Sequence, residues 1–199
     1  MKILEFTNQT KASELAVQLL AEAKKHEPQI TKDIKAVAKL NNAELIGLEN
    51  KFKSKLSLAR KIADYSAKQN ISLEQSAEEI NDGLRYTIIF AIEDYQNGFK
   101  NTLESLESQN YKIEIIWNAW KNENKDWDSG YRGINATIIS SQNQIFELQF
   151  HTTESFRLKT ETHGLYEEKR SQKTSRERVI EILQITRKLA ADIERPKGI

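Results

Sequence analysis

Glu147 is the residue of this sequence best placed to do chemistry, because it stands in the middle of an apolar run. The run Ile145–Phe150 alternates, so Glu147 and Gln149 share one strand face and the apolar side chains share the other. A charged side chain inside a buried sheet is costly unless something compensates its charge. The pattern therefore fits either a solvent-facing strand face or a carboxylate in a cleft, where it would hold a metal ion or accept a proton.

A basic segment, Lys51–Lys61, holds five cations in eleven residues. Ser54 is suited to cap a helix that begins after it, and Ser57 and Lys61 would then share a face of that helix. Backbone N–H groups and the dipole at a helix start favour anions, so this serine and the cations near Lys53 suit a polyphosphate. A solvated basic face is the alternative, because charge runs of this kind are common.

Asp82 is a second carboxylate, placed just before the apolar run of residues 84–91. Carboxylate and phosphate oxygens are the ligands that Mg²⁺ prefers, so Asp82 and Glu147 could hold the ion from two strands of one sheet. Arg85, three residues after Asp82, could neutralise phosphate. An Asp-Gly pair is also an ordinary turn, so this motif alone is compatible with a structural role.

Two apolar runs, Ile134–Ile139 and Ile145–Phe150, flank a Ser-Gln-Asn-Gln turn and predict a β-hairpin. Tyr131 and Arg132 precede it. An exposed tyrosine at this point could stack on a nucleotide base, and Arg132 could reach a phosphate or the edge of the base. A half-buried aromatic at the start of a strand is the alternative for Tyr131.

The composition limits the classes of function. The chain has 199 residues, a net charge of +1 at pH 7 and no cysteine. The charge provides no bulk field that would attract nucleic acid or a membrane, and the lack of thiols excludes disulfides and cysteine-ligated metals. We find no membrane-spanning run, signal-peptide pattern, P-loop or Gly-rich dinucleotide loop. The histidines, His26, His151 and His163, lack the spacing of a zinc site.

Hydrophobic periodicity predicts helices first, then a mostly antiparallel sheet with inserted helices, then helices again, which is an α+β fold. We expect one domain over residues 1–199. The expected helices cover residues 11–25, 31–40, 55–68, 73–80, 93–108, 154–170 and 175–193. The expected strands are a short strand within 43–53 that runs into a basic turn, then 84–91, 111–120 and the hairpin, with a loop at 121–129. The tryptophans, Trp117, Trp120 and Trp127, are expected to anchor the core and this loop.

Five motifs, in order, resemble the synthetase domain of the RelA/SpoT alarmone family over residues 45–170. The first family motif, R-x-K-x-x-x-S-x-x-x-K, is matched by Lys51, Lys53, Ser57 and Lys61. The others are matched by Asp82-Gly83-Leu84-Arg85, Gly130-Tyr131-Arg132-Gly133-Ile134-Asn135, Glu147-Leu148-Gln149-Phe150-His151-Thr152 and Thr162-His163-Gly164-Leu165-Tyr166-Glu167. The sequences of these motifs are most similar to those of a divergent, toxin-like branch of small synthetases found in polymorphic and phage-associated proteins.

Several positions depart from the family pattern. Lys51 and His151 each replace an arginine, and Asn135 replaces a histidine. Asp82 stands three residues before Arg85, where the family usually has five, although both separations are odd and place the two residues on corresponding strand faces. These positions lie near the phosphates and the acceptor, so the acceptor can differ from GDP or GTP.

The resemblance implies a nucleotidyltransferase-like fold with a mixed five-stranded sheet flanked by helices. It implies an enzyme that transfers the β,γ-pyrophosphate of ATP to the 3′-hydroxyl of a purine nucleotide, which yields (p)ppGpp or (p)ppApp. Asp82 and Glu147 would be catalytic and bind the cofactor Mg²⁺, and Glu147 would also deprotonate the acceptor. Two such carboxylates must converge on one face, and they would repel without a cation between them.

The resemblance also assigns residues to the two substrates. ATP would be bound by Lys51, Lys53, Ser57, Arg60, Lys61 and Arg85. The acceptor would be bound by Tyr131, Arg132, Asn135, Gln149, His151 and His163.

Two other functions stay open at the level of sequence. One is a toxin that pyrophosphorylates the 3′ end of tRNA, and the other is a non-catalytic nucleotide-binding or protein-binding module, against which the intact Asp82 and Glu147 argue. Expected partners are ATP and a purine nucleotide, with tRNA and an antitoxin or immunity protein as further candidates, and no membrane. We expect a cytoplasmic protein, or one delivered into a target cell, formed by the synthetase domain without a hydrolase or regulatory domain.

Overall fold

The computed structural model describes residues 2–121, 129–171 and 173–199. Trp127 and most of the loop expected at 121–129 lie outside the described residues. The helices are α1 (Lys2–Leu40), α2 (Lys55–Gln69), α3 (Leu73–Glu78), α4 (Tyr95–Glu107), α5 (Thr153–Glu161), α6 (His163–Arg170) and α7 (Arg176–Ala191). The strands are β1 (Glu44–Ile46), β2 (Arg85–Phe90), β3 (Lys112–Asn118), β4 (Ile134–Ile139) and β5 (Ile145–Thr152). Short 3₁₀ turns cover Leu48–Asn50 and Ala119–Lys121.

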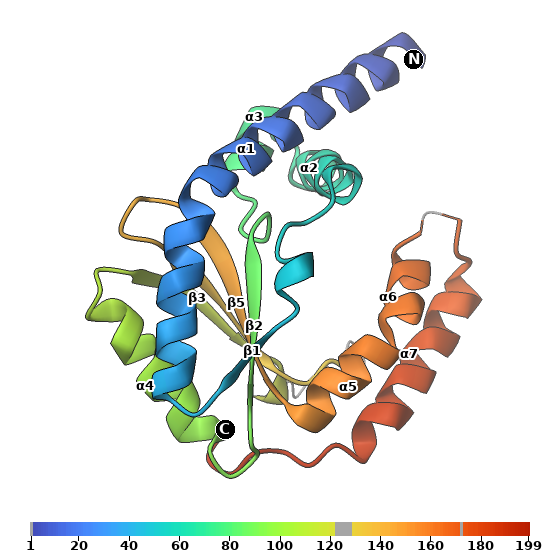
Figure 1. Cartoon of the computed structure of the whole chain (residues 1–199). Helices are drawn as coiled ribbons and strands as arrows, with labels where there is room; N and C mark the ends of the chain where they lie inside the picture. Colours follow the sequence, from blue (N-terminus) through green and yellow to red (C-terminus); the bar gives the residue numbers. More distant parts are fainter. Residues whose placement is uncertain (1, 122–128, 172) are drawn as a thin grey trace.

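The five strands form one sheet in the order β1-β2-β5-β4-β3. β2 and β5 run parallel, whereas the other neighbouring pairs are antiparallel. The expected α+β fold with a mixed, mostly antiparallel, five-stranded sheet is therefore confirmed. Figure 1 shows α1 and α4 on one side of this sheet and α5, α6 and α7 on the other.

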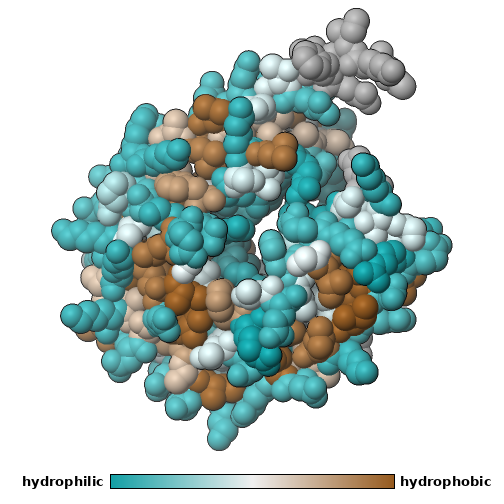
Figure 2. Space-filling model, turned by 45° about the vertical axis from the view of Figure 1, so that its right-hand side comes forward, coloured by the Kyte–Doolittle hydropathy of each residue, from teal (hydrophilic) through white to brown (hydrophobic). Residues whose placement is uncertain are grey.

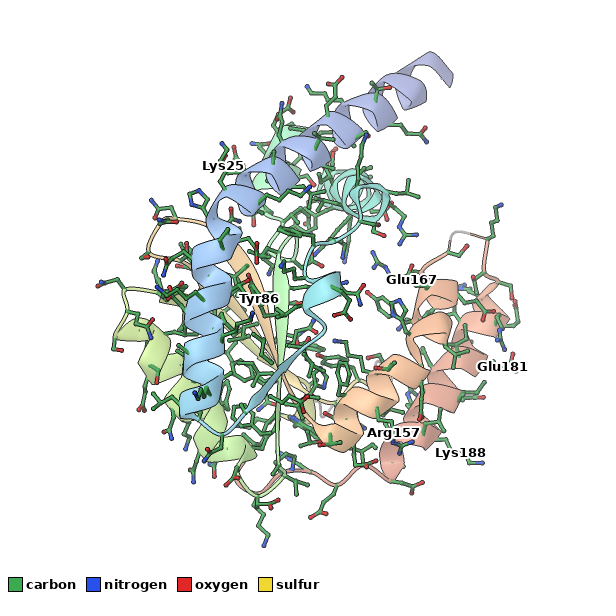
Figure 3. The ribbon with its side chains drawn as sticks, viewed as in Figure 1. Lys25, Tyr86, Arg157, Glu167, Glu181 and Lys188 are labelled. Carbon is green, nitrogen blue, oxygen red and sulfur yellow. The ribbon has the colours of Figure 1, made fainter. Side chains whose placement is uncertain are left out.

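The apolar face of the sheet forms the core beneath α1 and α4. Tyr86 and Phe146 are almost completely buried there, together with Ile30 and Ile34 of α1. The rings of Tyr86 and Phe146 meet edge to face at 5.8 Å, and the Tyr86 hydroxyl lies 2.8 Å from that of Thr31 in α1 (Figure 3). Burying one such side chain contributes about 1.5–3 kcal/mol. This packing fixes the sheet and leaves its opposite face available for polar groups.

The N-terminal helices differ from the prediction. Residues 11–25 and 31–40 belong to the single helix α1, although Pro28 lies inside it. A proline in a helix interior removes one backbone hydrogen bond and costs about 3 kcal/mol. Ala23 and Ile30, on either side of Pro28, are buried in the same core, and this packing keeps the chain helical across the proline. In Figure 1 the ribbon of α1 changes direction partway along, as a proline kink would produce.

The helix expected at 154–170 is instead two helices, α5 and α6. Thr162, which lies between them, has left the helical conformation (φ −91°, ψ 1°). Thr152 ends β5 and also caps α5 in a capping box with Ser155, so the strand passes directly into a helix that packs against β5 and β2. The break at Thr162 lets α5 cover the polar face of the sheet while α6 turns away from it.

Candidate active site

Backbone pairing brings the basic segment to Asp82. Lys53 donates its backbone N–H to the carbonyl of Gly83 at 3.0 Å, and Arg85 donates its own to the carbonyl of Lys51 at 2.8 Å. The stretch before α2 therefore lies alongside the start of β2 as a short antiparallel extension. This pairing places Lys53 and Asp82 side by side even though 29 positions separate them in the sequence.

Two lysines bind the carboxylate of Asp82. Lys53 and Lys61 each donate from Nζ to one of its oxygens, both at 2.8 Å. Burial by itself would raise the pKa of Asp82, but the charges and hydrogen bonds of the two lysines outweigh it and hold that pKa below its ordinary value. Burial lowers the pKa of Lys53, and repulsion by Arg85 and Lys61 acts in the same direction. The cluster carries more positive charge than one carboxylate compensates, which suits the oxygens of a phosphate chain.

Lys61 reaches this cluster from the second turn of α2. Ser54 caps the helix, as expected, and accepts a hydrogen bond from the backbone N–H of Ser57 at 3.2 Å. Ser57 and Lys61 are one turn apart and lie on the same face. The start of α2 therefore presents a hydroxyl and an ammonium toward the region of Asp82.

Glu147 lies beside the cluster, on the polar face of β5. It pairs with Arg85 of β2 in the parallel register. Burial raises the pKa of Glu147 and the negative charge of Asp82 raises it further, whereas Arg85 and Lys61 act against this shift. The two carboxylates are thus close enough for one to influence the ionisation of the other. Within the residues that the structure describes, no cation lies within 4.0 Å of the Glu147 carboxylate.

Two side-chain amides hold the carboxylate of Glu147. Asn135 donates from Nδ2 to one oxygen at 3.3 Å, and Gln149 donates from Nε2 to the other at 2.5 Å. The Tyr131 hydroxyl donates to Oδ1 of Asn135 at 2.6 Å, and Lys159 donates from Nζ to Oε1 of Gln149 at 2.5 Å. Each amide therefore has a donor on its oxygen and turns its NH₂ group toward Glu147. Such donors favour the ionised form of a carboxylate.

His151 supports this network as an uncharged ring. Its Nε2 lies 3.0 Å from the Tyr131 hydroxyl, and its Nδ1 lies 2.9 Å from the hydroxyl of Ser155. Burial lowers the pKa of His151 to about 3, and the charge of Lys159 acts in the same direction. Gly133 leaves room for the ring, because a Cβ at that position would lie 2.9 Å from His151 Cε1. The ring therefore offers hydrogen bonds to its neighbours but no positive charge at neutral pH.

Tyr131 and Trp117 form a stacked aromatic pair. Tyr131 is partly buried, which is the half-buried alternative that the sequence left open, and its ring stacks on Trp117 with 5.5 Å between centroids and 19° between planes. Burial raises the pKa of Tyr131 well above its ordinary value, and the charge of Glu147 adds to the shift. Trp117, expected as an anchor, is 48% exposed on the edge strand β3, whereas Trp120 is buried in the core as expected. Trp117 therefore supplies much of the accessible aromatic surface of the stacked pair.

Two of the predicted ATP ligands stand apart from the Asp82 cluster. Lys51 pairs with Glu27 of α1 at 2.9 Å. Arg60 pairs with Glu167 of α6 at 3.2 Å, and Figure 3 shows Glu167 pointing from α6 toward α2. This ion pair connects α2 with α6. Figure 2, with the side of α5–α7 turned forward, shows a hollow near the centre of the molecule that hydrophilic residues border.

Two of the predicted acceptor ligands, His163 and Arg132, lie in different parts of the structure. His163 lies on α6, stacked on Tyr166 with 6.4 Å between ring centroids, and it precedes Glu167 by one turn of that helix. It therefore sits near the contact between α6 and α2 rather than in the hydrogen-bonded network of Tyr131. Arg132 stays beside that network, because its Nη1 donates to the carbonyl of Tyr131 at 3.0 Å.

Lys159 is a residue of the site that sequence analysis missed. It follows Ser155 by four residues, so both lie on the face of α5 that meets the sheet. A single helix over residues 154–170, as the sequence predicts, does not indicate which of its side chains face the sheet. Only the capping box at Thr152 hints at a helix that begins directly at the end of β5.

The carboxylates of Asp82 and Glu147 are of the type that binds a hard cation. Among the described residues, no group of three or more His, Cys, Asp or Glu side chains could hold a metal ion. A divalent cation here would thus use two carboxylates and complete its shell with phosphate oxygens or water, as Mg²⁺ commonly does. The electrostatic repulsion that raises the pKa of Glu147 is what such a cation would relieve.

No protein-family model and no curated protein matches this sequence. Solved structures do match it in fold. Small alarmone synthetase 1 from Bacillus subtilis has a TM-score of 0.59 and 17% identity, over 87% of this chain and 89% of that one. A GTP pyrophosphokinase family protein from Streptococcus pneumoniae has a TM-score of 0.55 and 17% identity, over 96% of this chain and 88% of that one. The type VI effector Tas1, solved in complex with its immunity protein, has a TM-score of 0.54 and 15% identity, over 87% and 93%.

The fold of this chain is therefore that of the small alarmone synthetases. This agrees with the resemblance carried by the five sequence motifs, which lie on the elements that form the site. A search of the described residues for a helix long and apolar enough to cross a membrane finds none.

Proposed function

We propose that the chain is an ATP:nucleotide 3′-pyrophosphokinase that acts on a purine nucleotide. The observation that carries the proposal is the cluster of Lys53, Asp82 and Lys61 at the start of β2, where Glu147 pairs with that strand and feels the charges of Asp82 and Lys61. It combines cations that suit a polyphosphate with a carboxylate that can accept a proton. Transfers of phosphoryl type depend mainly on such positioning and charge neutralisation. The likeness in fold to a synthetase solved with its product pppGpp supports the same assignment.

On the donor side, Lys53, Ser57 and Lys61 bind the phosphates of ATP, with Arg85 behind them. Arg60 joins them when its ion pair with Glu167 opens. Both partners of that pair are about two-fifths exposed, and exposed ion pairs contribute only about 0–1 kcal/mol. A phosphate group can therefore replace Glu167 at little cost. Lys51 stays a predicted ATP ligand at the margin of this group.

In the transfer, the 3′-oxygen of the acceptor attacks the β-phosphorus of ATP and forms a new P–O bond. The bond from that phosphorus to the oxygen bridging to the α-phosphate breaks, and AMP leaves. Glu147 accepts the proton of the 3′-hydroxyl, held in place by Asn135 and Gln149. Asp82 and Glu147 are the residues that would hold Mg²⁺, which when bound would neutralise charge on the phosphate oxygens.

On the acceptor side, Tyr131 positions the purine base, and the exposed ring of Trp117 extends the same aromatic surface. Stacking of a base on an aromatic ring contributes about 1–3 kcal/mol. Arg132 and His151 lie next to Tyr131 and fix its orientation. His163 is better placed to contribute to the donor side, because its neighbours are the groups around Arg60.

Incubation of the pure protein with ATP labelled in the γ-phosphate, Mg²⁺ and a panel of acceptors tests the proposal. The panel holds GDP, GTP, AMP, ADP, ATP and deacylated tRNA. We expect label on one purine nucleotide and release of AMP in equal amount. Label on tRNA would establish the tRNA-modifying toxin instead. Binding of ATP without transfer to any member of the panel would contradict the proposal and favour a non-catalytic nucleotide-binding module.

The likeness to Tas1 favours one biological setting for this chemistry, that of a toxin controlled by an immunity protein. We infer that the chain would then consume ATP in the cytoplasm of the cell in which it acts. Induced expression in a bacterium should arrest growth, and the Glu147→Gln variant should not. Equal growth of cells that express the two proteins, at equal protein level, would contradict this setting without affecting the enzymatic proposal.

A further inference from the structure

Lys159 is a partly buried cation that has no role in the transfer described above. It lies on α5 one turn after Ser155, which is 1% exposed against the sheet. Its Nζ donates to Oε1 of Gln149 at 2.5 Å and lies 5.4 Å from the centre of the Phe156 ring. In the part of the chain that the structure describes, no carboxylate lies within 4.0 Å of this ammonium. A partly desolvated charge without a counter-ion is unfavourable unless an anion binds to it.

Arg85 is a second cation on the same face of the sheet. It stands opposite Glu147 in the pairing of β2 with β5, and it too makes no ion pair within 4.0 Å among the described residues. Burial and the charge of Arg85 lower the pKa of Lys159 to about 8, so the ammonium is still mostly protonated at pH 7. The charge of Arg85 also lowers the pKa of Lys53. Arg85 is therefore close enough to both Lys53 and Lys159 to influence their ionisation.

The polar face thus carries positive charge on both sides of Glu147. On the donor side, Asp82 compensates part of the charge of Lys53 and Lys61. On the side of Gln149, the hydrogen-bond acceptor of Lys159 among the described residues is the neutral oxygen of an amide. The neighbouring His151 is uncharged and cannot share the role of a cation. Glu147, which is more than 4.0 Å away, compensates the charge of Lys159 only in part, and this charge lies where the acceptor side of the site begins.

We propose that Lys159 forms a second phosphate-binding position on the Gln149 side of Glu147, together with Arg85, which this position shares with the donor side. The inference rests on the proposed pyrophosphokinase function and names a further ligand position within that site. The group bound there is a phosphate or pyrophosphate. It comes either from the acceptor nucleotide, which carries phosphates of its own, or from the pyrophosphate as it passes to the acceptor.

The direct test uses inorganic pyrophosphate as the probe and needs no turnover. Protein labelled with ¹³C at the lysine ε-carbons is titrated with pyrophosphate, and the signal of Lys159 is identified by its absence from the spectrum of Lys159→Arg. We expect this signal to shift saturably. Calorimetry should give about tenfold weaker binding for Lys159→Met, near-normal binding for Lys159→Arg, and wild-type binding for the control Lys188→Met on the exposed face of α7.

An unmoved Lys159 signal, while those of Lys53 and Lys61 shift, would overturn the proposal, as would wild-type affinity of Lys159→Met. Turnover with the acceptor found in the panel then separates the two sources. A raised KM for the nucleotide acceptor with unchanged kcat indicates a phosphate of the acceptor, and a lowered kcat with unchanged KM indicates pyrophosphate in transit. If no acceptor is turned over, the pyrophosphokinase proposal fails, while the shift of the Lys159 signal still reports an anion site.

Discussion

The candidate site has two halves, which we propose bind the donor and the acceptor, and they are built from different kinds of interaction. In the donor half, Lys53 and Lys61 face Asp82, so charge compensates charge. In the acceptor half, Glu147 is held by neutral amides, and behind them stands the partly buried Tyr131. One half is an ion cluster and the other is a hydrogen-bonded network.

The difference corresponds to what each half must do. A cation cluster tolerates exchange of partners, because a lysine ammonium binds a carboxylate or a phosphate from many directions. A network of oriented amides fixes one carboxylate in one direction, which proton transfer requires. We therefore expect changes in the donor half to alter binding and changes in the acceptor half to alter the rate of the chemical step.

The strongest test of this comparison is Glu147→Gln. The variant keeps the shape of the side chain but removes the proton acceptor and a metal ligand, so kcat should fall about a thousandfold or more. Stability should change little, because two effects oppose each other. The folded state raises the pKa of Glu147, so ionisation of this group at neutral pH opposes folding, and glutamine avoids that cost. The NH₂ group of the glutamine, however, faces one of the amide donors and loses that hydrogen bond.

The measurements for Glu147→Gln are turnover with labelled ATP and the thermal unfolding midpoint at pH 7. Calorimetry of ATP binding serves as the control, because the cation cluster is unchanged. Turnover near that of the wild type by a folded Glu147→Gln protein would remove Glu147 from the chemistry.

The donor half is tested by Lys61→Ala, which removes one charge-assisted hydrogen bond to a phosphate. Such a bond contributes about 1.5–3 kcal/mol, so ATP affinity should fall roughly tenfold to a hundredfold. Lys55→Ala is the matched control, because Lys55 is exposed on the same helix. Equal ATP affinities of both variants, measured by calorimetry, would indicate that the basic segment is a solvated face and does not bind ATP.

Lys53→Ala is expected to affect stability as well as ATP binding. Lys53 is 8% exposed, and its loss leaves a mostly buried Asp82 with one lysine. Removing one partner of a buried pair is strongly destabilising. We therefore expect Lys53→Ala to lower the unfolding midpoint as well as ATP affinity, whereas Lys61→Ala should lower mainly the affinity.

Tyr131 tests the acceptor half with two graded substitutions. Tyr131→Ala removes the stacked ring and should raise the acceptor KM or lower kcat about tenfold to a hundredfold, from roughly 1–3 kcal/mol of stacking. Tyr131→Phe keeps the ring and loses only the hydrogen bonds to Asn135 and His151, worth about 1 kcal/mol, so it should change kcat about fivefold. ATP binding should stay normal in both. A loss of ATP affinity with an unchanged acceptor KM would reverse the donor and acceptor sides.

The sequence predicted the parts of the site that are set by local pattern. Alternation in Ile145–Phe150 placed Glu147 and Gln149 on one face, and the register with β2 agrees. The cap at Ser54 follows from the type of residue before the helix start, and it is present.

What the sequence did not predict depends on contacts between distant segments. The exposure of Trp117 follows from the place of β3 at the sheet edge, which only strand order determines. Lys159 enters the site because the chain breaks at Thr162 and α5 lies on the polar face. Glu167 pairs with Arg60 across 107 positions, and no local periodicity encodes that contact.

The smallest predicted effect concerns this last contact, at the margin of the donor half. Glu167→Gln removes the partner of Arg60. Exposed ion pairs contribute about 0–1 kcal/mol, so the unfolding midpoint should scarcely change. ATP affinity should rise about twofold to fivefold, because phosphate no longer competes with Glu167 for Arg60.

Glu181→Gln is the matched control, since Glu181 is paired with Arg178 on α7 (Figure 3) and has no contact with α2 in the described structure. The difference between these variants in calorimetric ATP affinity measures whether Arg60 belongs to the donor half. Equal affinities would assign Arg60 a purely structural contact between α2 and α6, and would leave Lys53, Ser57 and Lys61 as the ATP ligands contributed by the basic segment.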